Sequence, residues 1–473
     1  MFHLKEIKQN RERKKHIGNH RYAFSVVLTV YNLEKYVEEA LESIIGQTFD
    51  FNKYIQVIIV DDGSTDSSEN ICRSYEEKYP KNIKYIKQEN GGVSNARNTG
   101  LRYIEGKYVT FFDGDDIWEN DAFGYVWDFF EKHYDEIDMV ACRRKWFEGM
   151  NAYAGNDFRF KNKSARIIDI FDEPSSFHLD VTSTFIKAKV AKNNTFKETL
   201  IVGEDCRYIN EILLETCRYG AVPAALLNMR RRIDGSSLTQ SVNYSSRAAI
   251  SAYTDTLSDY YEYFYDYSIK KFGQVIPYVQ YLIMDAIRYR TAILLPKGLD
   301  KEIADDYIRR INKIIEKTDL EVLLTLKRGN VSEKANLLKF KDPEAFSDKV
   351  TANGRDMLYG GIKFGRLGVK TALLVYRFDL SKGNTVIAGS IKLPSFLNNP
   401  NFFIHSDNTG VDHYITEIEI NAAKSEENIL GEYYKTVYEF KVEIPEVIKR
   451  EEISFYMHTD TESVKFDINE VIL

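Results

Sequence analysis

A chain of 473 residues and 54.9 kDa exceeds one ordinary domain, and at roughly 150 residues per domain it predicts about three. Its formal net charge of −7 at pH 7 argues against a dedicated nucleic-acid-binding protein, since such proteins usually carry a basic excess. The 44% of hydrophobic and 29% of charged residues exclude wholesale disorder and indicate a globular protein. The sequence shows neither a long apolar run nor an apolar leader, so we expect a cytoplasmic protein with four reduced cysteines.

The first 20 residues differ in charge from the rest of the chain. This segment, 1–20, holds six Lys or Arg residues and two Glu, a net charge of +4 on an acidic protein. Two interpretations stay open: a solvated tail, or a basic segment that docks on anionic lipid headgroups. The second predicts peripheral contact with the inner face of the cell membrane.

Residues 21–240 alternate between strand-like and helix-like patterns. The apolar, β-branched run 24–30 and the segment 57–60 predict two buried strands, and 83–87 and 108–112 predict two more strands, with helices between them. This alternation indicates an α/β domain with βαβ units and a mostly parallel, Rossmann-like sheet. Ligands of such sheets bind at the carboxyl ends of the strands, and acidic clusters follow two of the predicted strands.

The remainder of the chain shows three further patterns. Residues 241–330 contain few Gly or Pro and predict a helical segment, and the loop signals gathered in 331–365 predict a linker. Residues 366–473 alternate apolar and polar side chains, which predicts an antiparallel β-sandwich with a core of its own. The strand edges of this domain offer a route to a homo-oligomer.

The segment Asp113-Gly114-Asp115-Asp116 carries the strongest chemical signal. Three carboxylates at one strand end repel one another, and a hard divalent cation such as Mn²⁺ or Mg²⁺ relieves that repulsion. Gly114 allows a bulky ligand to approach the backbone, and a metal held here can neutralise a diphosphate leaving group. The alternative is a capped acidic turn at the surface. For the weaker signal at 61–64 (DDGS), the alternative is a plain turn that caps a helix.

Four segments together resemble the family 2 glycosyltransferases. They are 25–32 (SVVLTVYN), 60–66 (VDDGSTD), 90–98 (NGGVSNARN) and 112–116 (FDGDD), in the order and spacing of that family. A fifth segment, 203–205 (GED), resembles its Glu-Asp dipeptide. The resemblance covers residues 22–240, about half of the chain, and implies the GT-A fold. Thr29 stands where these enzymes usually have proline, and we expect no loss of chemistry from it.

The resemblance also implies roles for individual residues. Contacts with the nucleotide are implied for Tyr31, Glu34, Asp61, Asp62, Arg97 and Asp113. The resemblance implies further that Asp115 binds the metal and that Asp205 is the general base. Without the other motifs, Asp205 could equally be an acid in the first turn of a helix, where the positive end of the helix dipole stabilises a carboxylate.

Two features near these motifs each allow two interpretations. The first is the run Arg230-Arg231-Arg232, which Gly and Ser residues follow. It predicts a basic loop that closes over the diphosphate through Arg232. The alternative is a run of solvated charges at the surface. Trp118 either stacks on a sugar or packs in the core.

The sequence therefore predicts a metal-dependent inverting glycosyltransferase. By family expectation the donor is a UDP-sugar. The acceptor is a hydroxyl of a cell-surface polysaccharide, of a teichoic-acid-like polymer or of its lipid-linked precursor. The layout is similar to that of bacterial teichoic-acid and capsule glycosyltransferases, which pair a family 2 domain with C-terminal β modules. Two alternatives stay open: a non-catalytic carbohydrate-binding or scaffold protein on the same fold, and a nucleotidyltransferase.

Overall fold

The computed structural model describes most of the chain. The described residues are 13, 15–155, 157–160, 164–233, 246–291, 300–353, 356–366, 373–381, 384–394, 401–407, 409–420, 426–427, 433–445, 447, 452–458 and 463–466. The basic segment 1–20 lies mostly outside them. The chain folds into two compact units, Met1–Phe264 and Tyr265–Leu473.

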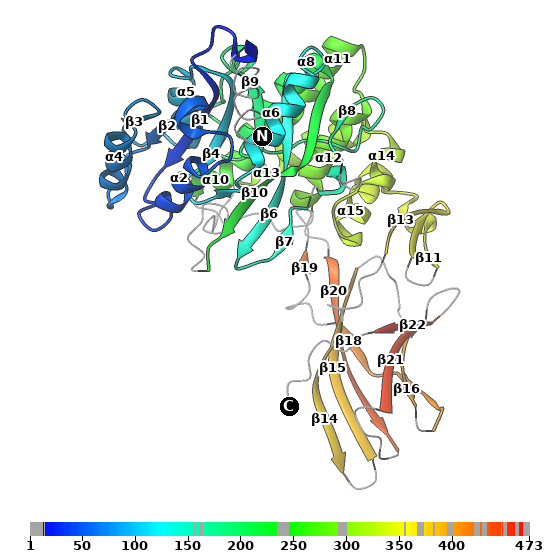
Figure 1. Cartoon of the computed structure of the whole chain (residues 1–473). Helices are drawn as coiled ribbons and strands as arrows, with labels where there is room; N and C mark the ends of the chain where they lie inside the picture. The colour runs from blue at the N-terminus through cyan, green and yellow to red at the C-terminus, as the bar shows by residue number, and fades with distance from the viewer. Residues whose placement is uncertain are drawn as a thin grey trace. The chain divides into compact units, whose positions relative to one another are not determined.

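The first unit is built on one mixed sheet of ten strands (Figure 1). Its strands are β1 (Tyr22–Val30), β2 (Ile55–Asp61), β3 (Ile83–Lys87), β4 (Gly106–Asp113), β5 (Ile117–Trp118), β6 (Met139–Glu148), β7 (Ala152–Tyr153), β8 (Arg166–Asp169), β9 (Thr184–Lys187) and β10 (Arg218–Arg231). Their order is β3-β2-β1-β4-β9-β6-β10-β5, with β7 beside β6 and β8 beside β10. The strands β1 to β4 pair in parallel, as do β6 and β10, and β9 joins the two halves through antiparallel pairs.

The helices of this unit connect the strands. They are α2 (Val37–Ile45), α3 (Phe51–Tyr54), α4 (Ser68–Lys78), α5 (Val93–Leu101), α6 (Ala122–Lys132), η1 (Asp157–Phe160), α7 (Ala188–Ala191), α8 (Glu204–Thr216), α10 (Ser246–Tyr253) and η2 (Leu257–Glu262), where η1 is a 3₁₀-helix and η2 a π-helix. The strands β1 and β2 are buried along almost their whole length, as expected for apolar strands of a parallel sheet covered on both faces. The predicted α/β domain with a mostly parallel sheet is confirmed.

Aromatic side chains fill a large part of the core of this unit. The ring of Phe24 on β1 lies 5.2 Å from Phe49, 5.1 Å from Phe123 and 5.3 Å from Phe185. Trp118 is 1% exposed and its ring lies 5.4 Å from that of Phe185. Of the two interpretations of Trp118, core packing is therefore the one that the structure confirms, and stacking on a sugar is excluded for a side chain so buried.

The second unit begins with helices and a small sheet. Its helices are α11 (Tyr263–Phe272), α12 (Pro277–Thr291), α13 (Lys301–Glu316), α14 (Leu320–Thr325), α15 (Val331–Lys341) and α16 (Phe346–Lys349), and its first strands are β11 (Val350–Asn353), β12 (Asp356–Tyr359) and β13 (Ile362–Arg366). Residues 331–365, which the sequence suggests as a linker, thus contain two helices and a three-stranded sheet. The loop signals there mark turns between short elements: Gly360 and Gly361, with φ of 57° and 82°, turn β12 into β13.

Two antiparallel sheets follow. The strands are β14 (Leu373–Ser381), β15 (Asn384–Pro394), β16 (Asn401–Ser406), β17 (Asp412–Ile415), β18 (Ile418–Ile420), β19 (Glu426–Glu427), β20 (Tyr433–Ile444), β21 (Ile453–His458) and β22 (Ser463–Phe466). One sheet has the order β14-β15-β20-β18 and the other β17-β16-β21-β22. Ring contacts between the sheets, Phe402 with Tyr438 and Phe440 with Phe455, show that they pack face to face. The predicted antiparallel sheets at the C-terminal end are confirmed.

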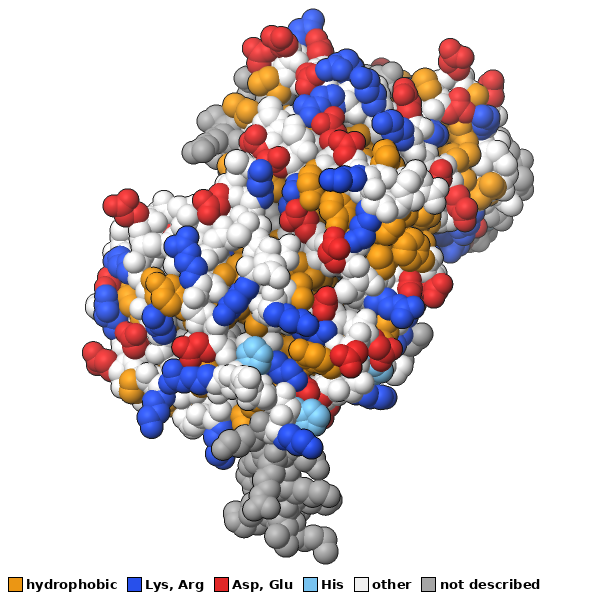
Figure 2. Space-filling model, turned by 90° about the horizontal axis from the view of Figure 1, so that it is seen from above, with side chains coloured by type: hydrophobic (Ala, Val, Ile, Leu, Met, Phe, Trp, Pro, Cys, Tyr) orange, Lys and Arg blue, Asp and Glu red, His pale blue; other side chains and the backbone are white. Residues whose placement is uncertain are grey.

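Charged side chains of both signs are interspersed on the face of the molecule in Figure 2. Hydrophobic side chains lie between them in small groups. On this face the described residues therefore do not gather into one extended region of a single charge.

Candidate active site

The acidic motifs meet at the carboxyl edge of the parallel strands. In the β1–β2 pair Val30 lies beside Asp61, and in the β1–β4 pair Thr29 lies beside Asp113. The Asp62 N–H donates to Val30 O at 2.9 Å, which holds the turn after β2 against the end of β1. The two clusters, about 50 residues apart in the sequence, therefore flank the end of one strand, as expected for ligand sites in parallel sheets.

Gly114 makes a close approach to the backbone possible. A Cβ at this position would lie 2.9 Å from Leu33 Cδ1 and 3.1 Å from Thr29 O. The Gly114 N–H donates to that same Thr29 oxygen at 3.1 Å. The glycine therefore lets the DGDD turn lie against the end of β1, in addition to any room that it leaves for a ligand.

Asp61 and Asp62 point in different directions. Asp61 is fully buried, and its carboxylate accepts the Ser64 N–H at 2.7 Å and the Tyr85 hydroxyl at 2.6 Å. Asp62 accepts the N–H groups of Gly91 and Gly92, at 2.9 and 2.8 Å. Asp62 thus joins the second motif to the third at the edge of the sheet, whereas Asp61 is directed into the core and holds its own turn.

The loop after β1 is fixed by hydrogen bonds to the start of α4. The Glu34 N–H donates to Asp66 Oδ2 at 3.0 Å, and the Glu34 carboxylate accepts the Ser67 N–H at 2.9 Å. Tyr31, on the same loop, is 51% exposed. Glu34 therefore holds this loop in place, and the Tyr31 ring lies open to solvent.

Arg97 on α5 joins Asp113 to Asp205, the predicted base. Its Nη1 donates to Asp205 Oδ1 at 2.5 Å and its Nη2 to Asp113 Oδ1 at 3.3 Å, and Glu204 Oε1 lies 3.4 Å from Nη1. The Arg97 side chain is 3% exposed. Burial alone would lower the pKa of Arg97, but Asp205, Asp113 and Glu204 raise it above its ordinary value. The guanidinium therefore stays charged and sets the distance between two motifs that lie about 90 residues apart.

The first turn of α8 presents two neighbouring carboxylates. Gly203, with φ of 93°, precedes the helix, and Asp205 Oδ2 accepts the Val181 N–H at 3.3 Å. Burial and the charge of Asp205 raise the pKa of Glu204 to about 8, so Glu204 holds a proton at neutral pH. Burial and the charges of Asp113 and Asp180 also raise the pKa of Asp205, against the lowering effect of Arg97 and of the Val181 hydrogen bond. A carboxylate with a raised pKa is a stronger base.

The other two acids of the DGDD turn have arginine partners. The Asp115 Oδ2 accepts from Arg232 Nη2 at 2.6 Å and from Arg232 Nε at 3.0 Å. Burial and Asp113 raise the pKa of Asp115, and Arg232 opposes that rise. Asp116 accepts the Arg230 N–H at 2.9 Å, and burial together with Asp115 and Asp113 raises its pKa well above the ordinary value. Negative charge is thus crowded at this strand end, in agreement with the interpretation as a cation site.

Arg230 and Arg232 differ in their surroundings. The Arg230 guanidinium contacts Glu39, Glu148 and the carbonyl oxygen of Asp115, so it is already bound on several sides. Arg232 pairs with Asp115 and lies 4.9 Å from the centre of the Tyr36 ring. The expected loop beyond Ile233 falls on 234–245, outside the described residues. Among the described contacts, Arg232 is thus the arginine of this run whose guanidinium pairs with the Asp115 carboxylate.

Three residues that belong to the predicted motifs, but for which the sequence predicts no individual role, also lie in this site. They are Glu204, Asp116 and Arg230. Glu204 and Asp116 each stand next to a predicted site residue, and Arg230 stands two positions before Arg232, so membership of the same motif is the signal that could find them. A sequence does not show which of two adjacent acids is buried, and burial is what raises the pKa values here.

A divalent metal fits this strand end only if the protein and a bound substrate share its coordination shell. Among the described residues no group of three or more His, Cys, Asp or Glu side chains is arranged to hold a metal ion. Mg²⁺ and Mn²⁺ commonly take one or two carboxylates and complete their shell with phosphate oxygens and water. Asp115, with Asp113 beside it, has the donor chemistry and the crowded negative charge for such a site.

Comparison with known proteins agrees with this arrangement. Residues 25–193 match the family model for glycosyl transferase family 2. The segment is a glycosyl transferase family 2 domain. The match takes in the first four motifs and ends before Asp205.

Relatives extend the similarity over most of the chain. The minor teichoic acid biosynthesis protein GgaB of Bacillus subtilis (strain 168) is 33% identical over 433 residues, which are 90% of this chain and 46% of GgaB. This chain thus spans about half of the length of that relative. TarS of Staphylococcus aureus (strain Mu50 / ATCC 700699), a poly(ribitol-phosphate) beta-N-acetylglucosaminyltransferase, is 28% identical over 183 residues, or 38% of this chain and 31% of TarS.

Solved structures share the fold. The crystal structure of S. aureus TarS covers 95% of this chain and 78% of TarS, with a TM-score of 0.52 and 17% identity. TarS 1–349 in complex with UDP-GlcNAc covers 73% of this chain and 99% of that structure, with a TM-score of 0.51 and 20% identity. These likenesses confirm the GT-A-like sheet followed by helices and C-terminal β-sheets.

The described helices have the lengths and compositions of ordinary packed helices. None of them combines the length with the apolar composition that crossing a bilayer requires.

Proposed function

We propose that the chain is an inverting, metal-dependent glycosyltransferase that moves a sugar from a nucleotide-sugar to a hydroxyl of a teichoic-acid-like or other cell-surface polymer, or of its lipid-linked precursor. The observation that carries the proposal is the single buried guanidinium of Arg97, which joins Asp113 to Asp205. One rigid contact thus fixes the acid on the donor side relative to the acid at the start of α8. A scaffold protein on the same fold would not need a fixed distance between Asp113 and Asp205.

The protein's own residues would divide the reaction between two sides. On the donor side, Tyr31 offers an exposed ring for the base and Asp62 shapes the loop beneath it. Asp115 would hold Mn²⁺ or Mg²⁺, which when bound neutralises charge on the departing diphosphate. Arg232, once released from Asp115, would donate to the same diphosphate oxygens.

On the acceptor side Asp205 would take the proton of the attacking hydroxyl. General-base catalysis of this kind contributes about 10²- to 10⁴-fold in rate. Its carboxylate is oriented by Arg97 on one oxygen and by Val181 N–H on the other, and its side chain remains 21% exposed. Attack from that side, opposite the leaving diphosphate, would invert the configuration at the transferred carbon.

The choice of UDP and of the acceptor rests on the relatives. TarS has been solved with UDP-GlcNAc, and GgaB is a minor teichoic acid biosynthesis protein. We extend these substrates to this chain as a proposal. Contact with the membrane through 1–20 and self-association through the C-terminal sheets belong to the same proposal.

The test combines a donor screen with one substitution. A panel of nucleotide-sugars is assayed for metal-dependent turnover, and Asp205→Asn is then compared with the wild type on the active donor. We expect unchanged affinity for the donor and a loss of roughly 10²-fold or more in kcat, because the base acts in the transition state. Donor affinity that falls in parallel with kcat would make Asp205 a donor ligand instead. Pyrophosphate release from a nucleoside triphosphate would favour the nucleotidyltransferase, and binding without any turnover would favour the scaffold protein.

A further inference from the structure

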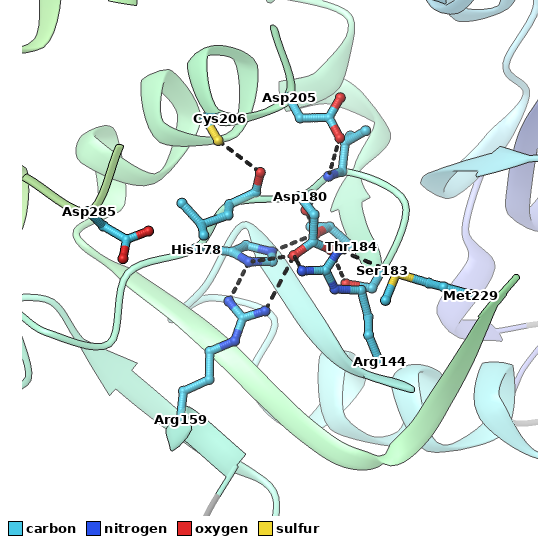
Figure 3. Close-up of polar contacts among 12 residues, drawn as sticks. Arg144, Arg159, His178, Asp180, Ser183, Thr184, Asp205, Cys206, Met229 and Asp285 are labelled. Carbon is cyan, nitrogen blue, oxygen red and sulfur yellow. Dashed lines mark hydrogen bonds and ion pairs between the residues drawn. The ribbon is translucent and has the colours of Figure 1, made fainter. Parts of the chain in front are cut away.

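A buried polar cluster lies behind the start of α8. It comprises Arg144 on β6, Arg159 on η1, and His178 and Asp180 on the loop between β8 and β9 (Figure 3). Arg159 and His178 are 1% and 0% exposed, so neither can reach a substrate. Burying this many polar groups is costly unless they are paired, which suggests that the cluster has a task.

Asp180 is the centre of the cluster. Its Oδ2 lies 2.9 Å from Arg144 Nη2 and 3.6 Å from Arg159 Nη2, and the Ser183 hydroxyl donates to its Oδ1. Burial alone would raise the pKa of Asp180, but Arg144 and Arg159, together with the Ser183 hydrogen bond, lower it below its ordinary value. Asp180 is therefore ionised at every pH at which the protein would work.

The contacts of His178 define its tautomer. The Thr184 hydroxyl donates to Asp180 O at 2.7 Å, so it must accept from His178 Nε2–H, which lies 2.6 Å away. His178 Nδ1 then accepts from Arg159 Nη1. Burial and the charge of Arg159 keep the pKa of His178 well below its ordinary value, so the ring is neutral. Every member of the cluster thus restrains the same loop.

Three backbone groups of that loop are attached to α8. The His178 carbonyl oxygen accepts from Asn210 Nδ2 at 2.9 Å, the Leu179 carbonyl oxygen accepts from Cys206 Sγ at 3.0 Å, and the Val181 N–H donates to Asp205 Oδ2 at 3.3 Å. In Figure 3 Asp205 lies above Asp180, and a dashed line runs from the Asp205 carboxylate toward Asp180's side of the view. The side chain of Asp180 and the N–H that follows it therefore connect the buried arginines to the proposed base.

We propose that Asp180, clamped by Arg144 and Arg159, is a positioning residue that holds the Asp205 carboxylate in the orientation needed to accept a proton. The inference rests on the proposed function, because it takes Asp205 as the base. Because Arg97 holds Oδ1 and Val181 holds Oδ2, the carboxylate cannot rotate, and each oxygen keeps a second lone pair that can accept from the acceptor hydroxyl. A small misorientation of a catalytic group is costly, since as little as about 1 Å can cost about 10²-fold in rate.

Asp180 also contributes charge. The charged or titratable groups around Asp205 are Arg97, Asp113, Glu204, Asp180 and Cys206. Of these, Asp113 and Asp180 strengthen the base and Arg97 weakens it. Removing the charge of Asp180 would therefore lower the pKa of Asp205, and the acid limb of the kcat profile would move to lower pH.

The test compares two variants of the cluster on the donor that the wild type turns over. For Asp180→Asn we expect kcat to fall about 10-fold or more with the donor KM unchanged, together with a shift of the acid limb to lower pH. For Ser183→Ala, which removes one hydrogen bond and no charge, we expect a smaller loss of kcat and no pH shift. If Asp180→Asn fails to fold, Ser183→Ala keeps the proposal falsifiable, because unchanged kcat in that variant would overturn it.

A double-mutant cycle separates this inference from the proposed function. If Asp180 acts through Asp205, Asp180→Asn has no further effect on kcat in the Asp205→Asn background. Additive losses would overturn the positioning role and leave the base in place. Full turnover by Asp205→Asn alone would overturn both. Asp169→Asn, which breaks the exposed pair with Arg218 on the same unit, is the matched control and should leave kcat unchanged.

Discussion

At the scale of single residues, the proposed metal ligand offers the most direct test. We expect Asp115→Ala to lose nucleotide binding that depends on Mn²⁺ and at least about 10²-fold in turnover, since charge on the leaving group is then uncompensated. The fold should survive, because burial already raises the pKa of Asp115 and its ionised form adds little stability. Calorimetric titration with UDP and Mn²⁺, together with a melting curve, measures both.

A surface acid supplies the control for this substitution. Asp306→Ala removes an exposed carboxylate of α13 that is paired with Arg309, and it should change neither binding nor turnover. Normal turnover by Asp115→Ala would show that the DGDD turn is not the metal site.

The glycine of the same turn tests the packing at the end of β1. Gly114→Ala would place its Cβ 2.9 Å from Leu33 Cδ1, so we expect a loss of about 1–3 kcal/mol in stability. Gly124→Ala is the matched control, because Gly124 lies within α6 and a Cβ there would meet no atom within 4 Å, so alanine should be neutral or stabilising. Chemical denaturation of both variants gives the comparison. Equal stability of the two would mean that Leu33 moves away at little cost.

At the scale of elements, Glu204 in the first turn of α8 makes the free energy of unfolding depend on pH. The folded protein holds a proton on Glu204 up to a pKa of about 8, whereas an unfolded chain releases it near 4.5. The folded state therefore binds more protons between these values, and this group makes stability fall as pH rises, by at most about 1.4 kcal/mol per pH unit.

Glu204→Gln removes that contribution. We expect the melting temperature of this variant, relative to the wild type, to rise between pH 5 and pH 8. The neutral amide retains the shape of the side chain beside Arg97. A constant difference across this range would show that Glu204 is ionised in the folded protein.

The elements also show how far sequence reasoning reaches. The four parallel strands were predictable: β1 and β2 are continuous apolar runs, which are typical of buried strands in such sheets, and acidic turns mark the ends of β2 and β4. The short elements between 331 and 365 were not, since strands of four or five residues separated by glycine turns look like a loop until their partners are known. In the site, the motif acids were predictable by residue type. Their partners were not, because Arg97 meets Asp205 and Asp180 meets Arg144 only through the packing of distant segments.

At the scale of the whole molecule, we expect that the two C-terminal sheets can be removed without unfolding the rest of the chain. Removing residues 367–473 leaves β11–β13 whole and takes away two sheets whose aromatic residues pack against each other. We expect turnover of a short soluble acceptor to remain nearly unchanged, while binding of a long polymer or self-association weakens. Light scattering and activity on acceptors of increasing length measure these effects. A folded truncated protein that no longer turns over its donor would show that the sheets complete the active site.

The pairing of Arg232 with Asp115 has a consequence for the order in which substrates arrive. The free chain supplies its own counter-ion to the carboxylate that is proposed to bind the metal. Loading the site is therefore an ion exchange: one cation must leave Asp115 as another arrives, and the displaced guanidinium needs a new anion. A nucleotide diphosphate provides that anion, so metal and donor are expected to enter together and to leave together.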